Sequence, residues 1–137
     1  MKTNYERRKV PATFHDLETI AYHHGVRAIT WHRHGPKGAW IPHQHRISLR
    51  YGMSDVQTLC TFAHEVGHAI HGHPPCQPGT PYEVKADEWA AKNLITQQDY
   101  EKAETLHLDH TWPLAQELGV TIDVLTTWKN LQSRKAS

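Results

Sequence analysis

The chain has 137 residues, a formal net charge of +1 with the histidines counted as neutral, and 38% hydrophobic residues. A chain of this length can bury one hydrophobic core without disulfide bonds, so we expect a single compact unit. The near-zero charge provides no overall attraction to nucleic acid, and no apolar run is long enough to span a membrane.

Two features indicate the compartment. The first residues, up to Val10, contain Arg7-Arg8-Lys9 and lack the apolar stretch of a secretory signal. The chain has 2 cysteines, Cys60 and Cys76, and neither belongs to a C-x-x-C pair. Reduced thiols explain this usage most simply. We therefore expect a cytoplasmic protein.

The first half of the chain predicts one helix followed by three short strands. Residues 13–24 have helical spacing of apolar side chains, and Gly25 ends the helix. Residues 26–31 alternate like a strand, and a Gly- and Pro-containing turn leads to a second strand at 39–42. Residues 45–51 form the third strand.

This third strand shows the clearest alternation. One face would carry Ile47, Leu49 and Tyr51, and the other would carry Arg46, Ser48 and Arg50. If the strand lies at the sheet edge beside the next helix, it can bind an extended peptide by adding a strand.

The next segment predicts a helix that contains a metal-ligand motif. Ser54 opens an S-x-x-Q capping box, and Gly72 ends the helix just after His71. Inside it lies the string HEVGH, residues 64–68. Histidines four apart on a helix can reach one Zn²⁺, and the glutamate beside the first lies over the open coordination position. With 13 histidines in the chain, accidental spacing on a solvated face is the alternative.

A catalytic zinc site requires a third protein ligand. A metzincin would place a glycine and then a histidine where this chain has His71 and Pro74, so that class is excluded. Pro81 opens a downstream helix on which Glu83 and Asp87 are four apart and share a face. Glu83 can therefore ligate the metal while Asp87 accepts a hydrogen bond from a ligand histidine.

Other interpretations of these acids stay open. Thr80 and Glu83 form a T-x-x-E pattern, in which Glu83 would bind backbone instead of metal. Glu88 is the substitute ligand, although it lies about 100° around the helix from Asp87. Asp87 can also be an exposed acid without a role in the site.

HEVGH followed by YEVKADEWAAKNL resembles the ImmA/IrrE family of metallopeptidases, which carry H-E-x-x-H and then a glutamate helix. The matching positions of that helix are Glu83, Ala86, Asp87, Trp89 and Ala90. The arrangement is also similar to the glutamate helix of thermolysin-like gluzincins. The resemblance covers about residues 13–96.

The resemblance implies a minimal zincin-like α+β fold, in which a small antiparallel or mixed three-stranded sheet packs on the active-site helix and the glutamate helix. It also implies a zinc endopeptidase that cleaves an intracellular protein, usually a helix-turn-helix repressor of a phage or mobile element. A metal-stabilised antirepressor that binds the repressor without cutting it is the alternative. Under either interpretation we expect the partner of this chain to be a protein, and we expect neither a membrane nor direct binding to nucleic acid.

The expected chemistry places Zn²⁺ on His64, His68 and Glu83, with Glu65 as the general base that takes a proton from the attacking water. A further donor should stabilise the oxyanion of the transition state. The candidates for that donor are Tyr82, His73 and His71.

The remaining chain predicts three helices, at residues 97–107, 112–119 and 121–131, with Thr121 as the cap of the last. The last two resemble a helix-turn-helix. The final helix carries Asp123 in its first turn and only Lys129 near its end, so it lacks the expected phosphate contacts, which favours a substrate-positioning role over DNA binding. We expect a core of residues 1–96 and a helical subdomain of residues 97–137, packed together as one unit.

Overall fold

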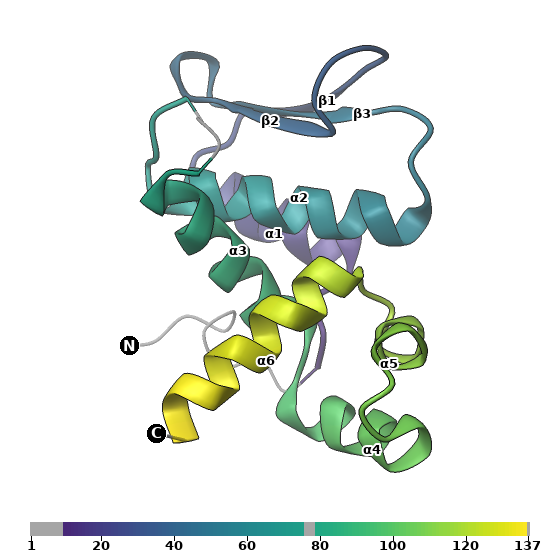
Figure 1. The fold of residues 1–137 in the computed structure, drawn as a ribbon. Coiled ribbons are helices and arrows are strands. Elements are labelled where there is room, and N and C mark those ends of the chain that lie inside the picture. The colour runs from purple at the N-terminus through teal and green to yellow at the C-terminus, as the bar shows by residue number, and fades with distance from the viewer. Residues whose placement is uncertain (1–9, 76–78, 137) are drawn as a thin grey trace.

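The computed structural model describes residues 10–75 and 79–136. Within them the chain forms a three-stranded sheet and six α-helices, which confirms the α+β class (Figure 1). The elements in chain order are α1 (Phe14–His23), β1 (Ala28–His32), β2 (Gly38–Ile41), a 3₁₀ turn (Pro42–Gln44), β3 (Arg46–Arg50), α2 (Asp55–Ile70), α3 (Pro81–Leu94), α4 (Gln97–His107), α5 (Thr111–Leu118) and α6 (Ile122–Ala136).

The described residues include only part of the two sequence features, the N-terminal segment and the cysteines, from which the cellular compartment was predicted. Arg7-Arg8-Lys9 and Cys76 lie outside the described residues, whereas Cys60 is a buried free thiol. No helix in the described part of the chain is both long and apolar enough to cross a bilayer.

The sheet is mixed, with the strand order β1-β3-β2. β1 runs parallel to β3, and β2 runs antiparallel to it, with Trp40 opposite Ile47. β3 is therefore the middle strand, with a hydrogen-bonded neighbour on each side. The condition under which it could bind a peptide by strand addition, a position at the sheet edge, is not met. The edge strands of the described sheet are β1 and β2.

The alternation of β3 does not divide its side chains into a buried and an exposed set. Ser48, on the face opposite to that of Ile47 and Leu49, is buried as they are. Its hydroxyl hydrogen-bonds to His32 Nδ1 at 2.7 Å. Tyr51, predicted to share a face with Ile47 and Leu49, lies beyond the end of the strand and is 56% exposed.

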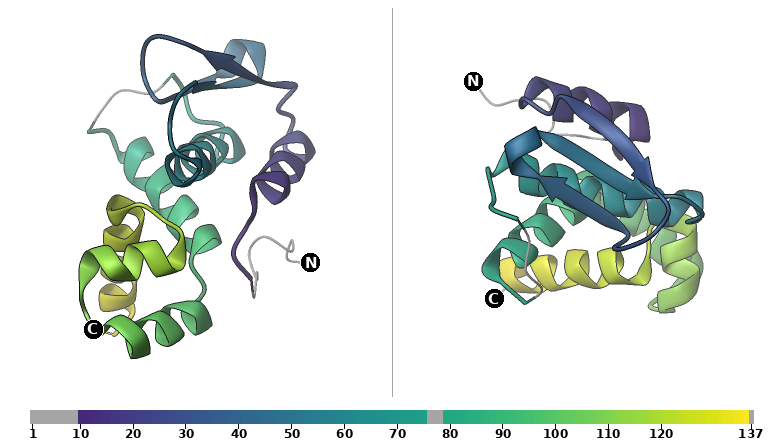
Figure 2. Two further views of the ribbon diagram at one scale, coloured as in Figure 1. Left: turned by 90° about the vertical axis from the view of Figure 1, so that its right-hand side faces the viewer. Right: turned by 90° about the horizontal axis from the view of Figure 1, so that it is seen from above.

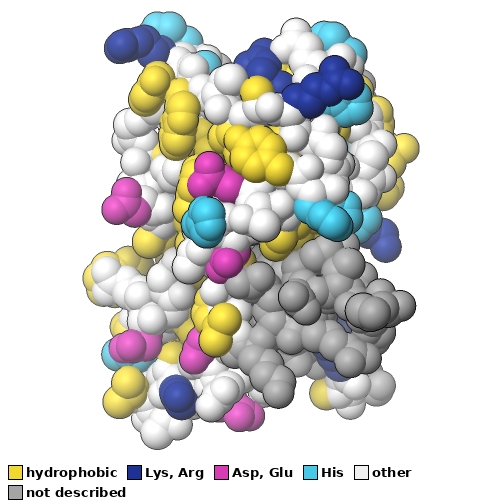
Figure 3. Space-filling model, turned by 180° about the vertical axis from the view of Figure 1, so that it is seen from behind, with side chains coloured by type: hydrophobic (Ala, Val, Ile, Leu, Met, Phe, Trp, Pro, Cys, Tyr) yellow, Lys and Arg dark blue, Asp and Glu magenta, His cyan; other side chains and the backbone are white. Residues whose placement is uncertain are grey.

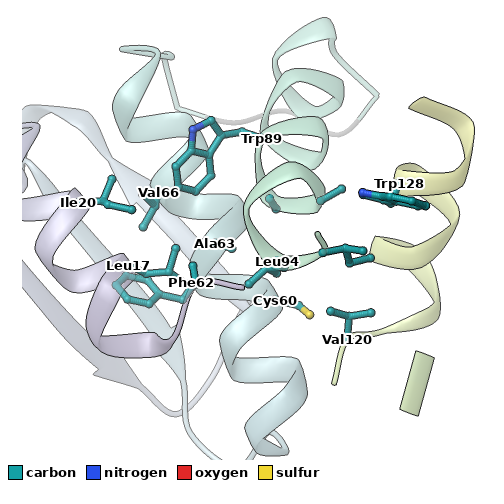
Figure 4. Packing of buried hydrophobic residues seen from close by; sticks show 14 of the residues in the cluster. Leu17, Ile20, Cys60, Phe62, Ala63, Val66, Trp89, Leu94, Val120 and Trp128 are labelled. Atoms are coloured by element: carbon teal, nitrogen blue, oxygen red, sulfur yellow. The ribbon is translucent and has the colours of Figure 1, made fainter. Parts of the chain in front are cut away.

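α2 occupies the centre of the molecule. The sheet covers one side of it, α1 lies beside it, and α3 with the C-terminal helices lies away from the sheet (Figures 1 and 2). Figure 4 shows the packing, in which Leu17 and Phe62 lie together on one side of the core, Val120 and Trp128 lie on the other, and Leu94 lies between them. A helix surrounded in this way holds its side chains in fixed positions.

α3 crosses α2 at very close range. A Cβ built on Gly67 would lie 3.1 Å from the Cα of Ala86, so glycine at this position allows the two backbones to approach. Ala86 itself is fully buried in the contact. This approach brings the first turns of α3 to the histidines of α2.

The C-terminal helices continue the same hydrophobic cluster. Leu125 and Trp128 of α6 are buried in it, and Tyr100 of α4 stacks on Trp128 with ring centroids 4.5 Å apart. Thr121 caps α6 as predicted, accepting a hydrogen bond from the backbone N–H of Val124 at 3.2 Å.

The predicted end of α6 at residue 131 is wrong, because the helix runs to Ala136. Neither glycine nor proline follows Leu131 to stop it. In addition, Arg134 donates to the Glu88 carboxylate of α3 at 2.5 Å, which gives the extra turn a partner.

The surface carries both signs of charge. On the face opposite to that of Figure 1, lysine and arginine side chains gather mainly toward the sheet end, and acidic side chains lie mostly below them (Figure 3). This mixture agrees with the net charge of +1.

Candidate metal centre

α2 presents its two motif histidines to α3. Ser54 caps the helix by accepting a hydrogen bond from the backbone N–H of Gln57 at 3.1 Å, as the capping pattern predicted. His64 and His68 lie one turn apart, with ring centroids 4.7 Å apart and planes at 85°. Their Nε2 atoms are 3.1 Å from each other and point to a common position.

Glu83 of α3 completes the group. Its Oε2 lies 2.9 Å from His64 Nε2, and its Oε1 lies 3.4 Å from His68 Nε2. A tetrahedral ion about 2.0–2.1 Å from each donor atom would require donor separations of about 3.3–3.4 Å. The separations between the two rings and from each ring to its nearest carboxylate oxygen are close to that value, and one donor atom from each residue lies within 4.8 Å of the others. The three residues can therefore hold a metal ion without movement of the backbone.

The other interpretations of the downstream acids do not match the geometry. The hydroxyl of Thr80 makes no capping hydrogen bond, and the carboxylate of Glu83 lies at the histidines instead of its own helix start. Glu88 faces α6, where it pairs with Arg134. Of the acids on α3, Glu83 is therefore the one placed to act as a ligand.

Asp87 lies one turn after Glu83 and contacts the far side of His64. Its Oδ1 is 2.7 Å from His64 Nδ1, so an Nδ1–H donates to the carboxylate and leaves the lone pair of Nε2 free. Burial on its own would lower the pKa of His64, but the hydrogen bond from Asp87 and the neighbouring carboxylates outweigh it, and the pKa is raised. Asp87 thus has the contact expected of a supporting carboxylate.

His68 is fully buried and has a different partner. Its Nδ1 lies 2.9 Å from Nδ1 of His73. Burial, followed by the nearby His64, lowers the pKa of His68 to about 4. The ring is therefore neutral at neutral pH, which is the form that ligates a metal.

The three candidate oxyanion donors have distinct positions. His73 is buried against His68, and burial followed by the charge of His71 lowers its pKa. His71 Nδ1 lies 2.6 Å from the carbonyl oxygen of Gly67, on its own helix. Tyr82 is 43% exposed, and its ring lies 4.8 Å from that of His73.

The contact of His73 with His68 was missed in the sequence. The HEVGH motif does not indicate a partner for His68 beyond the end of the helix. His68 and His73 are five residues apart, which is not a spacing that places two side chains on one helix face. The chain reverses at Gly72, and the backbone N–H of His73 donates to the carbonyl oxygen of His68 at 3.0 Å.

Glu65 lies beside the ligand group and is only 6% exposed. The backbone N–H of Trp40 in β2 donates to its carboxylate. A Cβ built on Gly38 would lie 3.0 Å from Glu65 Cγ and 2.6 Å from Thr61 Cγ2, so glycine allows β2 to pass this close. Burial, together with the charge of Glu83, raises the pKa of Glu65 to about 7, against the opposing effect of His64.

His64, Glu65 and Glu83 line a cavity of about 530 Å³. Its walls come from the start of β2, from the middle of α2, from the first turns of α3 and from the beginning of α6. The lining residues outside the ligand group are Lys37, Gly38, Gln57, Cys60, Thr61, Glu65, Asp87, Thr121, Ile122, Asp123 and Val124. The C-terminal helices therefore contribute directly to the space beside the candidate metal site.

The comparison with protein families agrees with this geometry. The family model for the IrrE N-terminal-like domain, Peptidase_M78, matches residues 6–126. No curated protein and no solved structure matches the chain. Because the match includes HEVGH, the glutamate helix and nearly all of the fold described above, this chain belongs to the IrrE N-terminal-like domain family of metallopeptidases, within the ImmA/IrrE group.

Proposed function

We propose that this metallopeptidase is a zinc-dependent endopeptidase with His64, His68 and Glu83 as the metal ligands. The observation that carries the proposal is the meeting of these three side chains, within 4.8 Å of one another, beside the buried carboxylate of Glu65. Two imidazole nitrogens and one carboxylate oxygen, with space left for water, are a donor set typical of catalytic zinc. When bound, Zn²⁺ supplies a Lewis acid that makes water a nucleophile at neutral pH and polarises a carbonyl group.

Glu65 is assigned the proton transfers. It accepts the proton of the attacking water and returns it to the nitrogen of the departing amine. Burial raises the pKa of Glu65 above its usual value, which makes its carboxylate a stronger base for this role. The N–H of Trp40 fixes the carboxylate in place.

The edge strand β2 is the element best placed to bind substrate. Its Trp40 N–H points away from β3 toward Glu65, so the outer edge of β2 faces the candidate site. An extended peptide that pairs with this edge would bring its backbone past Glu65. The strand-addition role expected for residues 45–51 is therefore proposed for Gly38–Ile41 instead.

We assign the oxyanion donor to Tyr82. The phenol of Tyr82 is partly exposed and precedes the ligand Glu83 in the chain, whereas His73 is buried against His68 and His71 bonds to a carbonyl oxygen of its own helix. A single such donor contributes roughly 3 kcal/mol to transition-state stabilisation.

The proposed substrate is a helix-turn-helix transcriptional repressor in the cytoplasm, as in other members of the family. Thr121 and the start of α6, through Ile122 and Asp123, form one wall of the cavity, so the C-terminal helices lie beside the space in which a substrate would bind. The start of α6, which would contact DNA bases in a recognition helix, is thereby turned toward the candidate metal site. We therefore propose that α5 and α6 position the substrate and do not bind DNA.

The test compares wild type with Glu65→Gln, each incubated with a candidate repressor and analysed by mass spectrometry for fragments and for bound metal. We expect discrete fragments with wild type and none with the variant, while both retain zinc. Cleavage by Glu65→Gln would remove Glu65 as the base. A variant that still inactivates the repressor without cutting it would favour the alternative, a metal-stabilised antirepressor.

A further inference from the structure

The two candidate ligand histidines are supported in different ways. The Nδ1 of His64 contacts a carboxylate, that of Asp87, at 2.7 Å. The Nδ1 of His68 contacts another imidazole, that of His73, at 2.9 Å. Supporting groups of ligand histidines are usually carboxylates, backbone carbonyls or water, so the second arrangement requires an explanation.

The hydrogen-bond directions follow from the role of His68. If His68 Nε2 ligates the metal, its lone pair is used there and the ring proton lies on Nδ1. His68 then donates to His73, and His73 must accept at Nδ1 and carry its own proton on Nε2. His73 is thus required as a neutral acceptor.

The surroundings of His73 hold its ring in this position. The side chain is 7% exposed and lies between two aromatic neighbours, with His71 stacked at 5.2 Å and 17° and Tyr82 tilted at 4.8 Å. Its backbone is held at both ends, since its N–H donates to His68 and its carbonyl oxygen accepts from the Trp40 indole at 3.0 Å.

We propose that His73 is a positioning residue for the metal centre, which fixes the ring orientation and the tautomer of His68 through the Nδ1–Nδ1 hydrogen bond. This inference rests on the proposed function, because it takes His68 as a metal ligand. It gives His73 a role in metal binding that is separate from oxyanion stabilisation.

The pairing also has an electrostatic consequence. Asp87 is 53% exposed in its side chain, so its charge is partly solvated, whereas the partner of His68 lies in the interior. A carboxylate at position 73 would add a buried charge near Glu83, which is costly. A neutral acceptor supports His68 without that cost.

The test measures zinc affinity by competition with a chromophoric chelator, using the full chain. His73→Phe keeps an aromatic ring against His71 and Tyr82 but offers no acceptor. His73→Asn places an amide oxygen close to the position of Nδ1. We expect the Phe variant to bind zinc about 10- to 100-fold more weakly than wild type. The Asn variant should remain within about threefold, because its oxygen accepts the same hydrogen bond.

His71→Leu is the matched control. It removes the ring stacked on His73 but leaves the contact with His68. We expect its zinc affinity to stay within about threefold of wild type. Visible absorption of the cobalt-substituted proteins gives a second measurement, since a rotated His68 changes the ligand field in the Phe variant and not in the Asn variant. Circular dichroism in EDTA verifies that each variant is folded.

The outcomes distinguish the inference from the proposed function. Equal affinity of wild type and the Phe variant, or equal weakness of the Asn and Phe variants, would overturn the role of His73. If His71→Leu weakens binding as much as His73→Phe, the stacked rings and not the hydrogen bond support the site, and the inference again fails. Absence of zinc binding by wild type would instead refute the metal centre itself.

Discussion

Replacing Glu65 by glutamine should stabilise the metal-free protein at neutral pH. Glu65 is 6% exposed and its pKa is raised from about 4.5 to about 7, mainly by burial. The folded protein therefore holds this proton more tightly than the unfolded chain. That contribution is complete below about pH 4.5 and is lost as the pH rises through about 7. Glutamine stays neutral and can still accept from the Trp40 N–H.

The size of the effect follows from the shift in pKa. At 1.36 kcal/mol per pH unit, a rise from about 4.5 to about 7 corresponds to about 3 kcal/mol at full ionisation. We expect the free energy of unfolding of Glu65→Gln, relative to that of wild type, to increase by roughly 2–3 kcal/mol between pH 5 and pH 8. A buried functional group that lowers stability is the usual cost of an active site.

Urea denaturation of both proteins in EDTA, across this pH range, gives the difference directly. Comparing the two proteins cancels the titration of all other groups that behave alike in them. Glu101→Gln, on the exposed surface of α4, is the control and should change stability by less than about 0.5 kcal/mol at either pH. If the difference in free energy of unfolding between wild type and Glu65→Gln does not change with pH, the burial of an ionisable carboxylate at this position is refuted.

Three further predictions concern the support of the site and the unity of the fold. Asp87→Ala removes the acceptor for His64 and should weaken zinc binding about 10- to 100-fold, measured by chelator competition; unchanged affinity would exclude a supporting role. Gly38→Ala should leave zinc bound but lower kcat/KM for repressor cleavage by roughly 100-fold, because the new Cβ displaces Glu65; full activity would contradict the close approach of β2. Leu125→Ala should lower the free energy of unfolding by about 2–5 kcal/mol within a single calorimetric transition. Two separate transitions would show that residues 1–96 and 97–137 unfold independently.

Local sequence signals predicted the helices well. Ser54 and Thr121 were placed as helix caps, and both accept the expected backbone hydrogen bonds. The helix at residues 97–107 was predicted with the bounds that the structure has. Capping side chains and apolar periodicity act within a few residues, so they can be recognised without knowledge of the fold.

The meeting of His64, His68 and Glu83 was also predictable. The spacing of the two histidines and that of Glu83 and Asp87 each describe one face of one helix, and the family resemblance implies that these two helices share a metal site. The strand order was not predictable in this way. Whether β3 lies at the edge or in the middle depends on which strands pair with it, and its alternating residues permit both. The contact between His68 and His73 depends on a chain reversal at Gly72, so it too is visible only in three dimensions.

Native mass spectrometry after zinc addition tests the central claim most directly. Wild type and Glu65→Gln should each carry one zinc ion per chain, and so should Glu88→Gln, because Glu88 pairs with Arg134 away from the site. Glu83→Ala should lose the ion under the same conditions, since two histidines alone are left to hold it. Stoichiometric zinc in Glu83→Ala, or its loss in Glu88→Gln, would contradict the assignment of Glu83 as the third ligand.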